Sequence, residues 1–278
     1  MDGYSSCVRF IPFVMISVAL TATAVSPASP AWAITNGSPD LAAHPQVGAI
    51  IGDKPNEDGT WSYCTGTLIS PTVFLTAAHC AAEGQKTARV SFSTRYRHGD
   101  KIYTGRYVVD SRYKDKADIH DMAVVIFDTA VPDIKPARLP TEGLLDRLDA
   151  ANALEITRFT PVGYGAVASS KIGAKGKHVS SGGRQKVRLT YTDTRHQASI
   201  SFKNLTRRWL KLSLASKGDG STCFGDSGGP NFLGGPTSDL LVATTISGDD
   251  DACRLTNYDY RLDTPQVRSF LKKFVTLP

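Results

Sequence analysis

One serine in a short glycine-rich turn limits the folds that are open to this chain. The turn reads Cys-Phe-Gly-Asp-Ser-Gly-Gly-Pro over residues 223–230. A serine hydroxyl is a weak nucleophile, so it needs a neighbouring base and hydrogen-bond donors for the oxyanion that it creates. The backbone N–H groups of Gly225 and Ser227 are candidate donors, and Gly228 and Gly229 leave room for an incoming chain. The simpler alternative is a hairpin turn that contains a serine by chance.

The order of the histidines decides between two folds that place a nucleophilic serine in such a turn. The pattern Gly-x-Ser-x-Gly also fits the nucleophile elbow of α/β-hydrolases, in which the histidine follows the serine in the sequence. All six histidines precede Ser227, namely His44, His79, His98, His120, His178 and His196. An esterase of the α/β-hydrolase fold is therefore excluded, and the order histidine, aspartate, serine remains.

The first 33 residues have the pattern of a secretory signal peptide. Arg9 precedes an apolar run from Phe10 to about Val25, and the segment ends in Ala-Trp-Ala at residues 31–33. These are the charged region, the apolar region and the Ala-x-Ala cleavage site of such a peptide. The run is short for a transmembrane helix and is interrupted, so no stable membrane anchor is expected. We predict a protein that is secreted to the extracellular space without residues 1–33.

Composition and charge favour a soluble globular protein. The 278 residues are 41% hydrophobic and 21% charged, with a net charge of +6. The signal peptide holds one base and one acid, Arg9 and Asp2, so its removal leaves the charge at +6. This mild excess of basic residues is not typical of a nucleic-acid-binding protein. The basic, tyrosine-rich stretch 81–118 is interpreted as the solvated face of β-hairpins rather than a surface for an anionic polymer.

Four cysteines follow the predicted signal peptide, which itself contains Cys7. They are Cys64, Cys80, Cys223 and Cys253. An even number in an exported chain favours two disulfides, and of the three pairings the local one joins Cys64 to Cys80 and Cys223 to Cys253. The cysteines form no Cys-x-x-Cys motif and have no histidine pair nearby, so no metal site is expected. No other cofactor is expected either.

Short apolar strands separated by turns fill the first half of the mature chain. Strand patterns cover residues 47–51, 61–69 and 73–76, which indicates an all-β barrel. A proline-spaced connection over 132–140 marks the expected boundary between an N-terminal part, 34–131, and a C-terminal part, 132–278. An amphipathic helix with an Asp263 cap is predicted at the end of the chain, over residues 263–274.

Two further residues have the properties that a serine nucleophile requires. His79 follows a strand within Thr-Ala-Ala-His-Cys, where the neighbouring cysteine can fix the imidazole by a disulfide. A base needs this fixing because it has to lie within hydrogen-bond reach of the hydroxyl. Asp121 directly precedes the apolar strand 122–127, so it is placed to accept the N–H of the His79 ring. Asp118 and Asp115 are the alternatives to Asp121.

The predicted signal cleavage creates a new N-terminus, Ile-Thr-Asn-Gly over residues 34–37. Ile34 then carries a free ammonium group next to an apolar side chain. Asp226 lies in a segment that is expected to be buried, and a buried carboxylate needs a partner. We expect an ion pair between Ile34 and Asp226 that also holds the Gly225 amide in place. The alternative is that Asp226 is a turn residue capped by backbone N–H groups.

Together these segments resemble the trypsin/chymotrypsin-like serine endopeptidases. The matching pieces span almost all of residues 34–278 and are Ile34–Gly37, Thr76–Cys80, Asp121 before its strand, Gly163–Gly165, Gly225–Pro230 and the C-terminal helix. The resemblance implies an all-β fold of two six-stranded antiparallel barrels and a C-terminal α-helix, forming one peptidase domain with the active site between the barrels. It implies His79 as the base, Asp121 as the residue that orients it and Ser227 as the nucleophile. The amides of Gly225 and Ser227 then form the oxyanion hole.

The resemblance also implies a mode of activation and a set of partners. Most relatives carry a propeptide before the residue that corresponds to Ile34, and none is recognised here. Signal cleavage alone is therefore expected to give the active form. The expected partner is a protein or peptide substrate, the family allows a proteinaceous inhibitor, and we expect a monomer. The presence of only two disulfides looks more like a bacterial exported enzyme than an animal one.

A second class of function shares this fold. It is a catalytically silent binding protein, in which the basic surface is the working face. Inactive members of the family usually lose a residue of the triad. The presence of His79, Asp121, Ser227 and Gly225 therefore favours the enzyme.

The family places Ser221, six residues before the nucleophile, at the base of the S1 pocket for the substrate side chain. A serine there resembles chymotrypsin-type pockets, which take apolar or aromatic side chains. The wall strand that usually reads Ser-Trp-Gly is here Ile-Ser-Gly, one residue out of step, which makes Ser247 and Gly248 the expected wall residues. A glycine is common near Tyr258, which leaves open that Tyr258 narrows or fills the pocket. A preference for a basic side chain is also open because of acidic residues nearby, namely Asp249, Asp250, Asp251 and Asp259.

Overall fold

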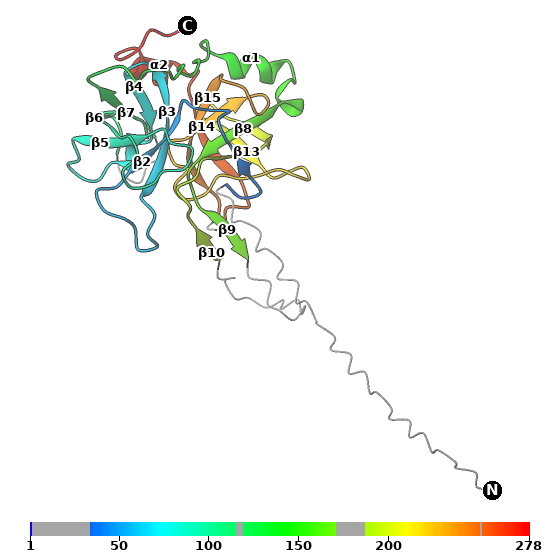
Figure 1. The fold of residues 1–278 in the computed structure, drawn as a ribbon. Helices are drawn as coiled ribbons and strands as arrows, with labels where there is room; N and C mark the ends of the chain where they lie inside the picture. Colours follow the sequence, from blue (N-terminus) through cyan, green and yellow to red (C-terminus); the bar gives the residue numbers. More distant parts are fainter. Residues whose placement is uncertain (2–33, 115–118, 171–186, 251) are drawn as a thin grey trace. The chain divides into compact units, whose positions relative to one another are not determined.

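Two closed antiparallel β-barrels make up most of the structure (Figure 1). They are seen in a computed structural model that describes residues 1, 34–114, 119–170, 187–250 and 252–278. The predicted signal peptide lies outside these residues apart from Met1. In the part of the chain that is described, no helix combines the length and the apolar composition that a membrane span requires.

The first barrel closes in the strand order β2-β3-β4-β7-β6-β5. Its strands are β2 (Val47–Ile51), β3 (Ser62–Ser70), β4 (Val73–Thr76), β5 (Thr87–Ser91), β6 (Tyr103–Val109) and β7 (Ala123–Phe127). Strands β2, β4 and β7 are almost wholly buried, as their continuous apolar runs predict. Gly66 on β3 leaves room for the Phe74 ring, because a Cβ atom on residue 66 would lie 2.4 Å from that ring.

The second barrel closes because β14 pairs with both β15 and β8. Its strands are β8 (Arg158–Gly163), β12 (Ile200–Leu205), β13 (Trp209–Ser213), β16 (Asn257–Arg261), β15 (Leu241–Gly248) and β14 (Pro230–Leu233). Two short strands, β11 (His196–Gln197) and β1 (Ser38–Pro39), extend the sheet from β8. The segment around Ser38–Pro39 is therefore attached to the second barrel. A separate hairpin ladder joins β9 (Val167–Ser170) to β10 (Val187–Thr190).

Within the described ranges, four short helical segments connect or follow the strands. They are the 3₁₀ turns η1 (Ala78–Cys80) and η2 (Leu154–Ile156) and the α-helices α1 (Leu144–Ala150) and α2 (Pro265–Leu271). Thr264 caps α2 by accepting from the Val267 N–H, so the predicted Asp263 cap is wrong by one residue. The Asp263 carboxylate instead accepts hydrogen bonds from the Leu145 N–H and from Arg261.

The cores explain how the two barrels are held against each other. The core of the first barrel continues into Val162, Phe232 and Tyr260 of the second and into the apolar face of α2, which lies beside the first barrel in Figure 1. A second core fills the other barrel around Phe159 and Ile200. The predicted fold class, two six-stranded barrels with a C-terminal helix, is confirmed.

A buried ion pair ties the N-terminal segment to the second barrel. Arg195 Nε lies 2.7 Å from Asp40 Oδ2, and both side chains are at most 1% exposed. His44 Nδ1 lies 2.5 Å from the other oxygen of Asp40. Burial by itself would raise the pKa of Asp40, but the His44 hydrogen bond and the Arg195 charge together lower it. Arg195 also donates to the Val47 carbonyl of the first barrel, so one guanidinium fixes three segments.

Candidate active site

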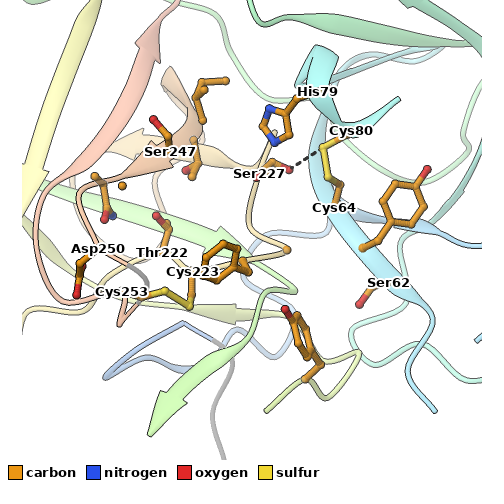
Figure 2. A pocket seen from close by; sticks show the side chains of 18 of the residues that line it. Ser62, Cys64, His79, Cys80, Thr222, Cys223, Ser227, Ser247, Asp250 and Cys253 are labelled. Atoms are coloured by element: carbon orange, nitrogen blue, oxygen red, sulfur yellow. Dashed lines mark hydrogen bonds between the residues drawn. A yellow bond between two sulfur atoms is a disulfide. The ribbon is translucent and has the colours of Figure 1, made fainter. Parts of the chain in front are cut away.

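A cavity of about 980 Å³ is lined by residues of both barrels. Figure 2 shows His79 and Ser227 together within it, with the Cys64–Cys80 disulfide on one side and Thr222 on the other. The structure therefore brings two residues that lie 148 positions apart, 227 minus 79, to the wall of one cavity.

One buried carboxylate fixes both the backbone and the ring of His79. The His79 N–H donates to Asp121 Oδ1 at 2.9 Å, and Nδ1 lies 2.6 Å from Oδ2. The Asp121 side chain is 1% exposed and that of His79 is 32% exposed. Because Nδ1 is engaged with the carboxylate, Nε2 is the ring nitrogen left for a reacting group. The alternatives Asp118 and Asp115 lie outside the described residues.

Hydrogen bonds from both barrels hold the turn around Ser227. The Thr65 N–H on β3 donates to the Ser227 carbonyl at 2.9 Å, and Cys80 Sγ lies 3.7 Å from the same oxygen (Figure 2). On the other side, the Gly228 N–H donates to the Thr245 carbonyl of β15. Gly228 has φ +80°, and a Cβ there would lie 2.2 Å from Thr76 Oγ1. The tight contact between the two barrels at this turn therefore requires glycine.

The peptide plane before Gly225 is fixed by the neighbouring segment. The Phe224 carbonyl accepts a hydrogen bond from the Ala166 N–H at 2.7 Å. Since this peptide bond is trans, the Gly225 N–H lies on the opposite side of the plane from that carbonyl. Thr65 Oγ1 donates to the Gly225 carbonyl at 2.8 Å and fixes the next plane. Neither the Gly225 nor the Ser227 N–H donates to an acceptor in the described ranges, so both are available at the cavity.

Both predicted disulfides are present, with the local pairing. Cys64–Cys80 links β3 to η1, and Cys223–Cys253 links the start of the turn around Ser227 to the loop before β16. All four cysteines line the cavity. The first disulfide ties η1, which contains His79, to β3, as expected from the sequence.

Asp226 is fully buried behind the turn. Its two oxygens accept the N–H groups of Gly165 and Cys223, each at 2.8 Å. Burial raises the pKa of Asp226 to about 7, although the two N–H groups oppose the shift. A Cβ at Gly163 or at Gly165 would lie within 2.5 Å of the carboxyl group, which explains why glycine stands at both positions.

The Ile34 segment lies next to the segment that leads to Asp226, through an isolated bridge between Thr35 and Ser221. Ile34 is 0% exposed, and Thr35 exchanges two backbone hydrogen bonds with Ser221, at 2.9 and 3.0 Å. Because Ala33 precedes Ile34 in this chain, the Ile34 nitrogen belongs to a peptide bond and carries no positive charge. No ion pair to Asp226 is found among the described residues, and the predicted pair with Ile34 stays a prediction.

Only half of the expected S1 residues line the cavity. Ser247 and Gly248 do so, whereas Ser221 is 0% exposed and lies behind the wall, with its Oγ donating to Asn257 Oδ1 at 2.8 Å. Tyr258 does not fill the pocket, because its ring packs against Trp209 with the centroids 6.2 Å apart. Successive side chains of a strand point to opposite faces, so Asn257 takes the inward position beside the outward Tyr258.

The acidic residues near the pocket divide into two groups. Asp249 and Asp250 line the cavity, together with Glu57 and Asp58 from the loop between β2 and β3. Asp259 does not line it and is 0% exposed, and Asn231 Nδ2 donates to its Oδ1 at 2.8 Å. Burial raises the pKa of Asp259 to about 8, although hydrogen bonds from Thr245 and Asn231 oppose the shift. The fourth expected acid, residue 251, lies outside the described residues.

Sequence reasoning missed Asn257 and the lining residues contributed by the loop between β2 and β3. The alternation of sides along β16 places Asn257 and Tyr258 on opposite faces, but it does not say which of them faces the cavity. Nothing in the sequence of the loop residues 56–58 signals that they lie at the cavity.

Comparisons with known proteins agree with the fold. The model of the trypsin family matches residues 43–270. A trypsin of Saccharopolyspora erythraea is 30% identical over 210 residues, covering 74% of this chain and 82% of the relative. A trypsin of Phaedon cochleariae is 26% identical over 219 residues, covering 71% of this chain and 79% of the relative. The solved structure of HL collagenase is similar in fold, with a TM-score of 0.61 and 19% identity over 86% of this chain and 97% of that one.

The family model covers more than half of the chain, and its match extends over both barrels. The relatives that are similar over most of their length are peptidases by name. The chain therefore belongs to the trypsin family and is a serine-type endopeptidase.

Proposed function

We propose that this protein is a secreted endopeptidase in which Ser227, His79 and Asp121 cleave peptide bonds through an acyl-enzyme. The observation that carries the proposal is the pair of contacts between Asp121 and His79, at 2.6 and 2.9 Å, in a cavity that Ser227 also lines. A carboxylate on Nδ1 sets the ring tautomer and leaves Nε2 free to take a proton. The two free N–H groups of Gly225 and Ser227 supply the remaining requirement of the reaction.

Acylation begins when Ser227 Oγ attacks the substrate carbonyl carbon and its proton passes to His79 Nε2. The negative charge that forms on the carbonyl oxygen accepts hydrogen bonds from the Gly225 and Ser227 N–H groups. Each such donor is worth about 10²–10³ in rate. Asp121 stabilises the imidazolium without taking its proton. The C–N bond then breaks, and His79 gives the proton to the leaving amine.

Deacylation repeats these steps with water as the nucleophile. His79 takes a proton from the water as its oxygen attacks the acyl carbon. The ester bond to Ser227 Oγ breaks, and the proton returns from His79 to that oxygen. The products are a carboxylic acid and the unchanged enzyme.

We also propose that cleavage before Ile34 gives the active form. The carboxyl group of Asp226 is buried with two backbone donors, and its pKa is raised to about 7 by that burial. A free ammonium at Ile34 would supply the missing positive charge and favour the carboxylate. Support comes from the buried position of Ile34 and from the pairing of Thr35 with Ser221.

The test is hydrolysis of a mixed peptide library by the secreted protein and two variants. Ser227→Ala should lower kcat by about 10⁶, because the nucleophile is lost. Asp121→Asn should lower kcat by about 10⁴, because the amide favours the wrong His79 tautomer. The matched control is Asp128→Asn, at an exposed position just after β7, which should keep full activity. Folded protein without hydrolysis, or full activity in Ser227→Ala, would contradict the proposal.

A further inference from the structure

Asn257 begins β16 at the wall of the cavity with only part of its amide hydrogen-bonded. The residue is 3% exposed, and its Oδ1 accepts from Ser221 Oγ at 2.8 Å. Its Nδ2 has no acceptor in the described part of the chain. A buried donor without an acceptor is costly to the protein. A substrate side chain that brings an acceptor to Asn257 removes that cost.

The cavity lining includes several hydroxyl groups besides the Asn257 amide. Hydroxyl groups come from four lining residues, namely Thr222, Thr245, Ser247 and Thr256. Ile246 and the Cys223–Cys253 disulfide contribute apolar surface to the same lining. This lining differs from the apolar pocket that Ser221 led us to expect.

The two acids that follow β15 in the lining, Asp249 and Asp250, already accept hydrogen bonds from the protein, which weakens their attraction for a positively charged side chain. Asp250 Oδ1 accepts the N–H groups of Arg254 and Leu255, both at 3.0 Å. Hydrogen bonds from Tyr258 and Thr256 lower the pKa of Asp249, so that carboxylate is engaged as well. Asp249 and one oxygen of Asp250 therefore already have hydrogen-bond donors from the protein.

A negatively charged side chain is disfavoured by the charge of the whole cavity. Four acids line it, namely Glu57, Asp58, Asp249 and Asp250. The described lining contains no lysine and no arginine, although the chain as a whole carries a charge of +6. The resulting negative potential repels a carboxylate substrate.

We infer that Asn257, rather than Ser221, selects the substrate side chain on the acyl side of the scissile bond. The selected side chain is neutral and ends in a hydrogen-bond acceptor, with glutamine as the best match. The carbonyl oxygen of glutamine pairs with Asn257 Nδ2, and its amide nitrogen finds hydroxyl acceptors in the lining. This inference rests on the proposed function, because it names the substrate class of the same site.

The first experiment measures kcat/KM for peptides that differ only in the residue before the scissile bond. Glutamine should exceed methionine, which has a similar length, by about tenfold or more, since the apolar side chain leaves the Asn257 donor unpaired. Glutamine should also exceed lysine and glutamate. A preference for lysine, methionine or phenylalanine would overturn the inference.

Two substitutions then test whether Asn257 is the selecting residue. Asn257→Leu has a similar volume and no donor, so the ratio of glutamine to methionine should fall to about one. Asn257→Asp has the same shape and replaces the donor by a carboxylate, so lysine should become preferred over glutamine. The matched control is Asn204→Leu, the same change at an exposed position on β12, which should keep the wild-type ratio. Unchanged ratios in both Asn257 variants would overturn the inference.

Labelling with a serine-reactive phosphonate separates this inference from the proposed function. Each protein is labelled and its mass measured before the peptides are compared. Labelled wild-type protein without a preference for glutamine overturns the inference alone. Folded wild-type protein that takes no label overturns the proposed function and this inference with it.

Discussion

Two threonines of β3 offer a matched test of how the nucleophile turn is held. Thr65 is 0% exposed, and its Oγ1 donates to the Gly225 carbonyl at 2.8 Å and accepts the Tyr164 N–H at 3.1 Å. Thr67, two residues further along the strand, is 1% exposed, and its Oγ1 has no partner among the residues that the structure describes. Valine has nearly the shape of threonine without the hydroxyl, so the same substitution tests both positions.

The two substitutions should have opposite effects on stability. Thr65→Val leaves two groups unpaired, the buried Tyr164 N–H and the half-buried Gly225 carbonyl. At about 1–3 kcal/mol for each group, the loss is roughly 2–6 kcal/mol. This is a large part of a typical unfolding free energy of about 5–15 kcal/mol. Thr67→Val removes a buried hydroxyl that has no partner, so it should be neutral or stabilising by about 1 kcal/mol.

Activity, like stability, should fall in Thr65→Val and not in Thr67→Val. The Gly225 carbonyl is no longer fixed in Thr65→Val, so the peptide planes that orient the oxyanion donors loosen. Losing one such donor outright costs about 10²–10³ in rate, and a misplaced donor should lower kcat/KM by about tenfold. Thr67→Val should keep the wild-type value.

Urea unfolding gives the free energies, and peptide hydrolysis normalised by active-site titration gives the rates. An equal loss of stability in both variants would refute the reasoning, because it would mean that the hydrogen bonds of Thr65 contribute nothing. Wild-type activity in Thr65→Val would refute the part that concerns the oxyanion donors.

Three further predictions concern buried charges and the disulfide beside the base. The folded pKa of Asp259 is about 8, far above its ordinary value of 3.8, so wild-type stability should fall as pH rises from 4 to 8. Asp259→Asn should flatten that slope in urea unfolding between pH 4 and 9, and an unchanged slope would contradict the assignment. Replacing Cys64 and Cys80 by serine opens a link between residues 16 apart and should cost about 3 kcal/mol in thermal unfolding, with a lower kcat/KM. Arg195→Met leaves the buried Asp40 carboxylate without its positive partner, so it should lower the free energy of unfolding by about 3–5 kcal/mol in urea. Adding Asp40→Asn to the Arg195→Met protein removes the unpaired charge and should restore most of that loss.

Much of the fold was predictable because the chain repeats short local patterns. The apolar runs 47–51 and 73–76 are strands β2 and β4, and the terminal amphipathic stretch contains α2. The candidate site was predictable where its chemistry lies in a short motif, as for His79 next to its cysteine. The order of histidine and serine was enough to exclude the competing fold.

The parts that sequence reasoning missed depend on which side of a strand a residue faces or on distant contacts. Tyr258 and Asn257 are neighbours on β16, and only the register with β15 and β13 decides which of them faces the cavity. Arg195 and Asp40 form their ion pair across 155 positions, a separation over which the sequence carries no local signal. The residues that line the pocket are therefore determined by the assembly of the two barrels and not by a local motif.

The most direct test of the account is the intact mass of the secreted protein before and after reaction with a serine-reactive phosphonate. We predict a chain that begins at Ile34 and gains one label, which is located on Ser227 and absent from Ser227→Ala. A folded protein that takes no label, or takes it on another residue, would contradict the proposed chemistry. A labelled protein whose chain begins elsewhere would keep the chemistry and contradict activation by cleavage before Ile34.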